Sequence, residues 1–233
     1  MLKNRLSGPW AAFILIILAV AIIYSNTFEY PFEFDDVAKI KGNVEIRDLT
    51  NYLFIDRMLK PRALVDFSFA LNYRFGEQEV FGYHLTNVLI HIINGFLVYL
   101  LALTLFRHFF SSPQSSKPHQ PESSTPFMAL SAALIFVSHP IQTQAVTYTV
   151  QRYTSLATLF YLASVLFYLK ARVGKEGNKR KSHSKVFVFF ALSSICGMAA
   201  FLSKEISASL PGIILLMEYL VMDRSWQASL LLE

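Results

Sequence analysis

Long blocks of apolar residues, separated by polar loops, dominate this sequence and limit what it can fold into. A helix needs about 20 mostly apolar residues to cross a bilayer, and several blocks here reach that length. Only 16% of the 233 residues are charged, whereas soluble domains carry roughly 25%. The sequence therefore predicts an all-α, polytopic helical membrane protein.

The formal net charge of +5 would by itself be compatible with nucleic-acid binding. The lysines and arginines, however, concentrate in short loops between apolar blocks, where membrane topology accounts for them. We therefore expect no nucleic-acid partner. Cys196 is the one cysteine of the chain and lies within an apolar block, so it forms no intrachain disulfide.

We predict about six transmembrane segments in one membrane domain, residues 1–233, without a repeat domain. The first begins like a signal peptide, but no clear small-x-small cleavage site follows it, so we expect a retained helix. The third is short for a full span, and Pro140 favours a helix end there; the chain either starts this helix in the preceding loop or re-enters at His139 and Pro140. The six segments are residues 6–26, 83–106, 126–139, 153–170, 185–202 and 206–222.

The basic residues predict the orientation of these segments. Residues 170–185 contain seven basic residues and one acidic residue, and the N-terminus and residues 107–126 are also net basic. These stretches share one side if every segment crosses, and the positive-inside rule makes that side, with the N-terminus, cytoplasmic. The net acidic loop 27–82 then faces outward from a bacterial inner membrane or the endoplasmic reticulum, and its residues 51–72 predict a helix on the membrane surface.

Asp35 and Asp36 follow the first segment directly, within the sequence Phe-Glu-Phe-Asp-Asp. Neighbouring carboxylates can provide a general base, because a like charge raises the pKa of one of them. They can also bind a divalent cation. A helix N-cap is an equally open reading, since aspartate favours that position.

Four polar residues form a stripe in the second segment: His84, Asn87, His91 and Asn94. Their spacing of 3, 4 and 3 confines them to an arc of about 80° on a helix. Such a stripe faces either a bundle interior or a water-filled cavity, or it joins helices by hydrogen bonds. Metal binding by His84 and His91 is disfavoured, because seven residues place them about 10 Å apart along the axis.

Two further motifs belong to the same predicted membrane face. His139 and Arg152 lie where the third segment ends and the fourth begins, and Lys204 and Glu205 lie between the last two segments. An arginine there can extend to the interface, or bind a phosphate through its bidentate fork. Lys204 and Glu205 are equally compatible with a simple interfacial ion pair.

The order of these motifs resembles that of a known membrane-enzyme family. The series comprises Phe34-Asp35-Asp36, Gly42-Asn43, Pro61-Arg62-Ala63-Leu64, Gly82-Tyr83-His84-Leu85-Thr86-Asn87 with His91, His139-Pro140, Gln151-Arg152 and Ser203-Lys204-Glu205. It is similar to the membrane domain of the transmembrane-and-tetratricopeptide-repeat O-mannosyltransferase-like family, within the polyprenyl-phosphate-sugar glycosyltransferases of the C-type fold. The resemblance covers most of residues 28–219.

This resemblance implies a reaction and roles for individual residues. Such enzymes pass a sugar from a polyprenyl- or dolichyl-phosphate donor to an acceptor outside the cytoplasm, and the family name makes mannose the candidate sugar. Asp35 or Asp36 would act as the base, and Arg62, Arg152 and Lys204 would bind the lipid phosphate. His84 would line the pocket. From the motifs themselves we add Asn87, His139 and Glu205 to the predicted substrate-binding residues.

The chain also departs from the family, whose members have about ten or more spans and often a C-terminal repeat domain. We therefore expect either a glycosyltransferase, or its N-terminal half, or a non-catalytic membrane scaffold that assembles with a second chain supplying the missing helices. A transporter fragment ranks last, because the internal repeats expected of transporters are absent from the sequence.

Overall fold

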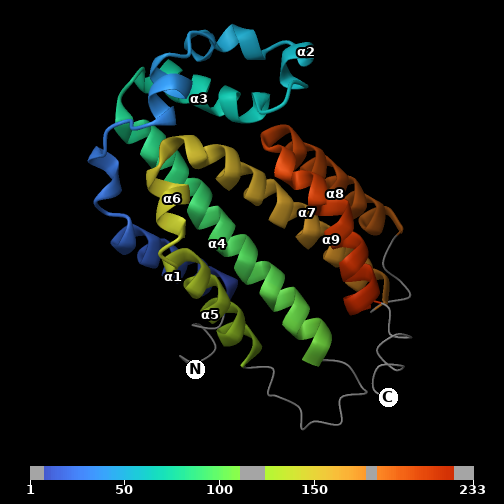
Figure 1. The fold of residues 1–233 in the computed structure, drawn as a ribbon. Coiled ribbons are helices and arrows are strands. Elements are labelled where there is room, and N and C mark those ends of the chain that lie inside the picture. The colour runs from blue at the N-terminus through green and yellow to red at the C-terminus, as the bar shows by residue number, and fades with distance from the viewer. Residues whose placement is uncertain (1–7, 111–123, 177–182, 223–233) are drawn as a thin grey trace.

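The computed structural model describes residues 8–110, 124–176 and 183–222, which form a helical bundle with a smaller helical layer across one end (Figure 1). No β-strand occurs in these ranges. The longer helices are α1 Pro9–Ile23, α3 Ala63–Gly76, α4 Val80–Phe110, α5 Thr125–Ser138, α7 Arg152–Glu176, α8 His183–Ser203 and α9 Leu210–Met217. Short helical turns are η2 Thr27–Glu29, η3 Val37–Lys41, η4 Glu45–Arg47, η5 Leu49–Tyr52, α2 Ile55–Met58, α6 Gln142–Thr147, η6 Thr149–Gln151, η7 Glu205–Ser209 and η8 Glu218–Met222.

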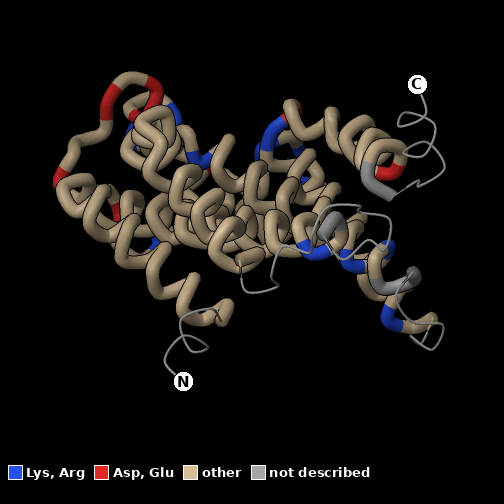
Figure 2. Tube along the Cα trace, turned by 90° about the horizontal axis from the view of Figure 1, so that it is seen from below, with Lys and Arg blue, Asp and Glu red and all other residues tan. Residues whose placement is uncertain are grey.

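The all-α membrane fold predicted from the sequence is confirmed, but six full spans are not. Among the described residues, three helices are long and apolar enough to cross a membrane: Val80–His108, Thr149–Val173 and His183–Ser203. The other apolar helices, Pro9–Ile23 and Thr125–Ser138, are shorter than the roughly 20 residues that a perpendicular span requires. Charged residues lie mainly at helix ends and in connections, whereas the helix bodies are largely uncharged (Figure 2).

Prolines account for several of the helix boundaries. Pro9 and Pro126 occupy the first turns of α1 and α5, where the missing N–H costs no intrahelical hydrogen bond. α5 ends at Ser138, just before the His139-Pro140 step, as Pro140 predicts. The chain does not turn back there: α6 continues to the end of the bundle where α7 begins (Figure 1).

One hydrophobic core joins α1, α4, α5 and α6. Its buried side chains include Ala12, Ile16, Val20, Val88, Ile92, Ala129, Ala133, Val137 and Val146. Small residues let these helices approach closely, as is common in membrane bundles. Gly95 of α4 is an example, because a side-chain carbon at that position would collide with Val137 and crowd Ile16.

α7 and α8 form the second half of the bundle. Ser164 and Ser193 exchange hydrogen bonds across this pair: each hydroxyl donates to the other residue's backbone carbonyl, at 2.8 Å and 2.9 Å. Such reciprocal bonds satisfy polar groups that lipid could not hydrate. On the outer side, large apolar residues of α8 and α9 remain exposed, among them Phe187, Ile195, Met198, Phe201 and Leu215.

Loop 24–62 and α3 form the layer across one end of the bundle (Figure 1). α2 and α3 confirm that the first long loop contains helices. Their core includes Ile40, Ile46, Val65 and Phe69, packed against Tyr83 of α4 and Tyr153 of α7. The layer is thereby fixed to the ends of two long helices.

Arg152, the first residue of α7, lies at the centre of this junction and is fully buried. Its Nε donates to Asn87 Oδ1 at 2.7 Å, its Nη1 to Asn72 Oδ1 at 2.6 Å, and its Nη2 to the backbone carbonyl of Tyr83 at 2.8 Å. Two weaker contacts reach Ser68 on α3, both at 3.3 Å. One guanidinium group therefore connects α3, α4 and α7.

Aromatic rings complete the surroundings of Arg152. Its guanidinium carbon lies 4.4 Å from the ring centroid of Phe69 and 5.7 Å from that of Tyr83. Aromatic faces attract cations more strongly where water is excluded. Because the buried acceptors and rings match the planar fork of arginine, lysine could not replace it without losing several contacts.

We predict that Arg152→Met lowers the free energy of unfolding by about 3 kcal/mol or more, because several buried acceptors lose their donor. Arg152→Lys should fall between this variant and the wild type, since it keeps the charge but loses the fork. Thermal unfolding in detergent provides the measurement. Arg74→Met is the matched control, because Arg74 is exposed on α3; equal unfolding temperatures for Arg152→Met and this control would contradict the prediction.

Candidate functional site

A small cavity of about 150 Å³ lies where the end layer meets α7 and the α8–η7 connection. We call it the cationic cavity. Three basic residues line it, Lys39, Arg62 and Lys204, together with one carboxylate, Asp35. Val150, Gln151 and Tyr153 form the remaining wall. Four charged side chains from three distant parts of the chain thus share one small space.

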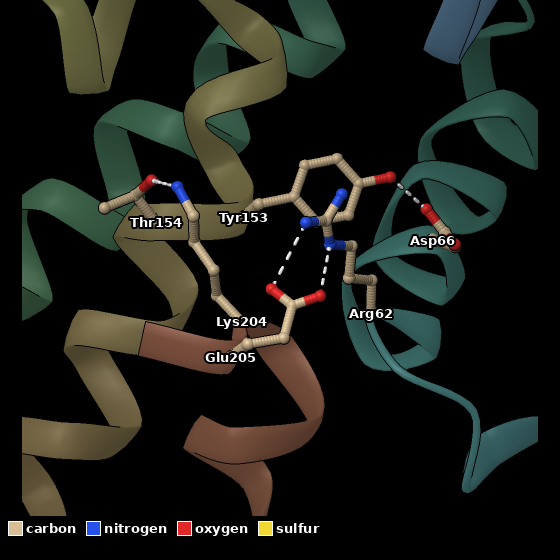
Figure 3. Close-up of polar contacts among 6 residues, drawn as sticks. All are labelled: Arg62, Asp66, Tyr153, Thr154, Lys204 and Glu205. Atoms are coloured by element: carbon tan, nitrogen blue, oxygen red, sulfur yellow. Dashed lines mark hydrogen bonds and ion pairs between the residues drawn. The ribbon is translucent and has the colours of Figure 1, made fainter. Parts of the chain in front are cut away.

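Arg62 enters the cavity from the start of α3. It has φ of 70°, in the left-handed region that non-glycine residues rarely adopt. Its guanidinium carbon lies 5.7 Å from the ring centroid of Tyr153, and the Tyr153 hydroxyl donates a hydrogen bond to Asp66 (Figure 3). Burial raises the pKa of Asp66, although this hydrogen bond opposes the shift. Asp66 therefore fixes the ring beside Arg62.

Lys204 reaches the cavity from the opposite side, between α8 and η7. Its Nζ donates to Thr154 Oγ1 at 2.7 Å (Figure 3). The Thr154 hydroxyl in turn donates to Gln151 Oε1 at 2.8 Å. This chain of hydrogen bonds orients an ammonium group and an amide toward the same space.

Glu205 lies next to Lys204 and forms an ion pair with Arg62. Arg62 Nε donates to Glu205 Oε1 at 3.1 Å and Nη2 donates to Oε2 at 3.2 Å (Figure 3). A hydrogen bond from its own backbone N–H and the bond from Arg62 lower the pKa of Glu205. Both side chains remain about half exposed, so an anion arriving from solvent can compete with Glu205 for Arg62.

Asp35 and Asp36 occupy different environments. Asp35 is exposed and lines the cationic cavity. Asp36 is buried and accepts a hydrogen bond from the backbone N–H of Val150 at 2.6 Å. Burial raises the pKa of Asp36, and the bond from Val150 opposes this shift. Asp36 thus attaches the loop to the start of the fourth predicted segment, whereas Asp35 remains accessible.

A second, larger cavity of about 440 Å³ lies beside the same loop. We call it the aromatic cavity. Tyr30, Phe34 and Tyr148 supply its rings, and Glu33 and Asp36 supply two carboxylates. Residues of α6 close one side: Thr143, Gln144 and Thr147. Residues 33–36 therefore separate two cavities of opposite charge.

The polar stripe of α4 is buried and bonded to neighbouring segments. His84 Nε2 donates to the Tyr30 carbonyl at 2.9 Å, and Asn87 Nδ2 lies 3.3 Å from the carbonyls of Val146 and Thr149. Deeper in the helix, His91 Nε2 donates to the Val137 carbonyl at 3.2 Å and Asn94 Nδ2 to the Ser155 carbonyl at 3.0 Å. Of the alternatives that the sequence leaves open, interhelical hydrogen bonding fits these contacts.

The structure therefore divides the residues selected from the sequence. Asp35, Arg62 and Lys204 line the cationic cavity and Glu205 pairs with one of them. Arg152, His84 and Asn87 are buried and line neither cavity. His139 is exposed and lines neither cavity; its Nδ1 accepts a hydrogen bond from the backbone N–H of Ile141 at 3.2 Å.

The site predicted from the sequence did not include Lys39, Gln151 or Tyr153, although Gln151 belongs to a motif noted beside Arg152. The last two flank Arg152, and successive residues of a helix point about 100° apart, so the burial of Arg152 directs its neighbours elsewhere. Lys39 follows Asp35 by four residues, one helical turn, but irregular turns in the loop gave no periodic signal. The burial of Arg152, which the sequence does not reveal, would have identified Gln151 and Tyr153 as residues of the cavity wall.

No metal site is evident in the described ranges: they contain no group of three or more His, Cys, Asp or Glu side chains arranged to hold an ion. The divalent cation considered for Asp35 and Asp36 does not fit their geometry either, because one carboxylate is buried against a backbone amide and the other faces three cations. Those cations would repel a metal ion.

Curated relatives match nearly the whole chain. It is 30% identical over 232 residues to protein O-mannosyl-transferase Tmtc3 of Drosophila melanogaster, covering 91% of this chain and 24% of that protein. It is also 30% identical over 230 residues to protein O-mannosyl-transferase TMTC4 of Homo sapiens, covering 92% of this chain and 30% of the relative. A third relative, protein O-mannosyl-transferase tmtc2 of Xenopus laevis, is 32% identical over 64% of this chain and 17% of its own length.

No protein-family model and no solved structure matches the chain. The chain spans less than a third of the length of these curated relatives. The matched region contains both cavities and the helices that form them. This chain belongs to the transmembrane-and-tetratricopeptide-repeat O-mannosyltransferase-like family of membrane proteins.

Proposed function

We propose that this chain is the part of a glycosyltransferase that holds the phosphate of a lipid-linked sugar next to the catalytic base. The observation that carries the proposal is the cationic cavity, where Asp35 shares about 150 Å³ with Lys39, Arg62 and Lys204. This volume is smaller than the roughly 300–1,000 Å³ of a typical ligand pocket. It suits a single phosphate group better than a complete sugar.

The substrates follow from the relatives and from the charges. The relatives are named protein O-mannosyl-transferases, which supports mannose as the sugar and a protein hydroxyl as the acceptor. A polyprenyl- or dolichyl-phosphate donor would present one anionic phosphate near the membrane surface. Further helices, in a second chain or beyond the matched region, would complete the groove for its lipid.

In the proposed reaction, the Asp35 carboxylate takes the proton from the acceptor hydroxyl. The acceptor oxygen then forms a bond to the anomeric carbon of the sugar, and the bond from that carbon to the phosphate oxygen breaks. Its electron pair leaves with the lipid phosphate. Arg62, Lys204 and Lys39 would stabilise the charge that develops there, as fixed cations do most effectively in a site shielded from water.

Arg152 and Asn87 have positioning roles in this proposal. The Arg152 guanidinium is fully buried and bonded to acceptors from α3 and α4, so a phosphate would have to displace protein partners to reach it. Its contribution would instead be to hold Gln151 and Tyr153 at the cavity wall.

We also propose that the cavities face away from the cytoplasm, with the N-terminus cytoplasmic. α4 and α7 end, and α5 and α8 begin, at the end of the bundle away from α3 (Figure 1). The segments that join these ends carry the basic excess, and the positive-inside rule favours cytoplasmic basic loops. Lipid-linked sugar would then be used in the organelle lumen or the periplasm.

We expect Asp35→Asn to reduce sugar transfer by about 10²–10⁴-fold, the usual contribution of a general base. The assay measures transfer from a polyprenyl- or dolichyl-phosphate mannose donor in membranes that contain the full chain. Because Asp35 is exposed, the variant should unfold at the wild-type temperature. Asp48→Asn is the control: Asp48 lies in the same loop and caps η5 through Thr50, a role that asparagine retains. Wild-type turnover in Asp35→Asn would remove the proposed base.

Lys204→Met should raise the donor KM about 10-fold to 100-fold, because a charged hydrogen bond to the donor phosphate is lost. The acceptor KM should stay within about twofold, since the change concerns the phosphate alone. Lys60→Met provides a matched control on an exposed lysine that does not line the cavity. Equal donor KM values in both variants would contradict the phosphate role.

The orientation is tested with single cysteines in a Cys196→Ser background. Val44→Cys lies in the end layer and Ser184→Cys in the first turn of α8, and both positions are exposed. A membrane-impermeant maleimide applied to the non-cytoplasmic side should label Val44→Cys alone, and Ser184→Cys should react only after permeabilisation. Labelling of both from the same side would overturn the proposed sidedness.

A further inference from the structure

The aromatic cavity lies directly beside the cationic cavity, with residues 33–36 as the wall between them. Asp35 lines the cationic cavity, whereas Glu33, Phe34 and Asp36 line the aromatic one. At about 440 Å³ it falls within the range of roughly 300–1,000 Å³ typical of ligand pockets. A substrate held there would reach the proposed base by extending past the edge of this one loop.

The wall is held in place by contacts far apart in the sequence. The backbone N–H of Asp35 donates to the Tyr148 hydroxyl at 3.1 Å, and the backbone N–H of Val150 donates to Asp36 at 2.6 Å. Tyr148 lines the aromatic cavity and Val150 the cationic one. The two cavities are thus joined through the loop rather than formed independently.

Phe34 is the most unusual residue of this wall. Its φ is 47°, in the left-handed region where a bulky residue costs about 1–3 kcal/mol. The residue is also 83% exposed, and its ring lies edge-on to that of Tyr148, with 6.4 Å between ring centroids. The strained backbone thus holds a largely exposed aromatic ring beside another aromatic residue of the cavity. Such strain concentrates at binding sites.

The charge of the aromatic cavity distinguishes its occupant from the donor. The residues that line it include two acids, Glu33 and Asp36, and two tyrosines. Among these lining residues there is no Lys, Arg or His. An anionic lipid phosphate would be repelled there. Thr143 and Gln144 are exposed on α6 and offer hydrogen-bonding groups of the kind that bind a peptide backbone.

We propose that the aromatic cavity binds the acceptor: an extended peptide segment that presents a Ser or Thr hydroxyl to Asp35 and has neutral or basic residues beside it. Phe34 and Tyr148 contact the apolar parts of the peptide, and Glu33 selects for basic neighbours. This inference rests on the proposed function for the hydroxyl that reacts, but binding itself requires no transfer.

The test measures binding and transfer separately, using two fluorescein-labelled threonine peptides that differ only in having lysine or glutamate beside the threonine. Fluorescence anisotropy with the full chain in nanodiscs, without donor, should show tighter binding of the lysine peptide. Glu33→Lys should weaken its binding about threefold to tenfold and strengthen that of the glutamate peptide by a similar factor. Phe34→Ala should weaken both about twofold to tenfold, and Phe34→Tyr should restore them.

Glu29→Lys is the matched control for Glu33→Lys, because Glu29 is an exposed acid of the same loop that does not line this cavity; it should leave both peptides unchanged. In transfer assays, Glu33→Lys should change the peptide KM and leave the donor KM within about twofold. A change confined to the donor KM would assign the cavity to the donor and overturn the proposal, as would unchanged peptide binding in both Glu33→Lys and Phe34→Ala. Charge-dependent peptide binding without any sugar transfer would support the peptide site. It would contradict only the proposed transferase activity.

Discussion

The buried guanidinium of Arg152 is the interaction on which the rest of this end of the molecule depends. Asn72 of α3, Asn87 of α4 and the Tyr83 carbonyl accept its hydrogen bonds, while α7 begins at the arginine itself. A buried charge is costly unless each donor finds a partner, so this geometry has few alternatives. The position of α3 relative to the long helices, and hence of Arg62 at its start, follows from it.

Sequence reasoning predicted the membrane fold, the order of the helices and the end of α5 at Pro140, because apolar length and proline act locally. It also predicted one face for the stripe from His84 to Asn94, since helical spacing alone determines that face. It could not predict which way Arg152 turns. From the sequence, an arginine beside an apolar segment that faces solvent cannot be distinguished from one that faces buried acceptors. Here one of those acceptors, Asn72, is 80 positions away. The full count of six spans is not confirmed, because among the described residues α1 and α5 are apolar but shorter than a perpendicular span requires.

The sequence also could not show that Asp35 is exposed whereas Asp36 is buried. Both are aspartates in one dipeptide, and only contacts with residues 113 and 114 positions away, Tyr148 and Val150, separate an exposed carboxylate from a buried one. Asp36 holds the loop to the start of η6. Asp35 is left facing Lys39, Arg62 and Lys204. In this reading the pair is not two interchangeable bases but a fixed residue beside an accessible one.

In the proposed reaction, the charges around Asp35 would have to satisfy two opposing demands. Cations must be close enough to stabilise a departing phosphate, yet an unpaired cation beside a carboxylate weakens it as a base. The ion pair between Arg62 and Glu205 meets both demands: before a donor arrives, the guanidinium charge is balanced by Glu205 rather than by Asp35 alone. The ammonium group of Lys204 donates a hydrogen bond to the neutral hydroxyl of Thr154. An incoming phosphate would replace Glu205 and Thr154 as the partners of Arg62 and Lys204. Because the phosphate brings its own negative charge, the positive charge beside the base would not rise when the donor binds.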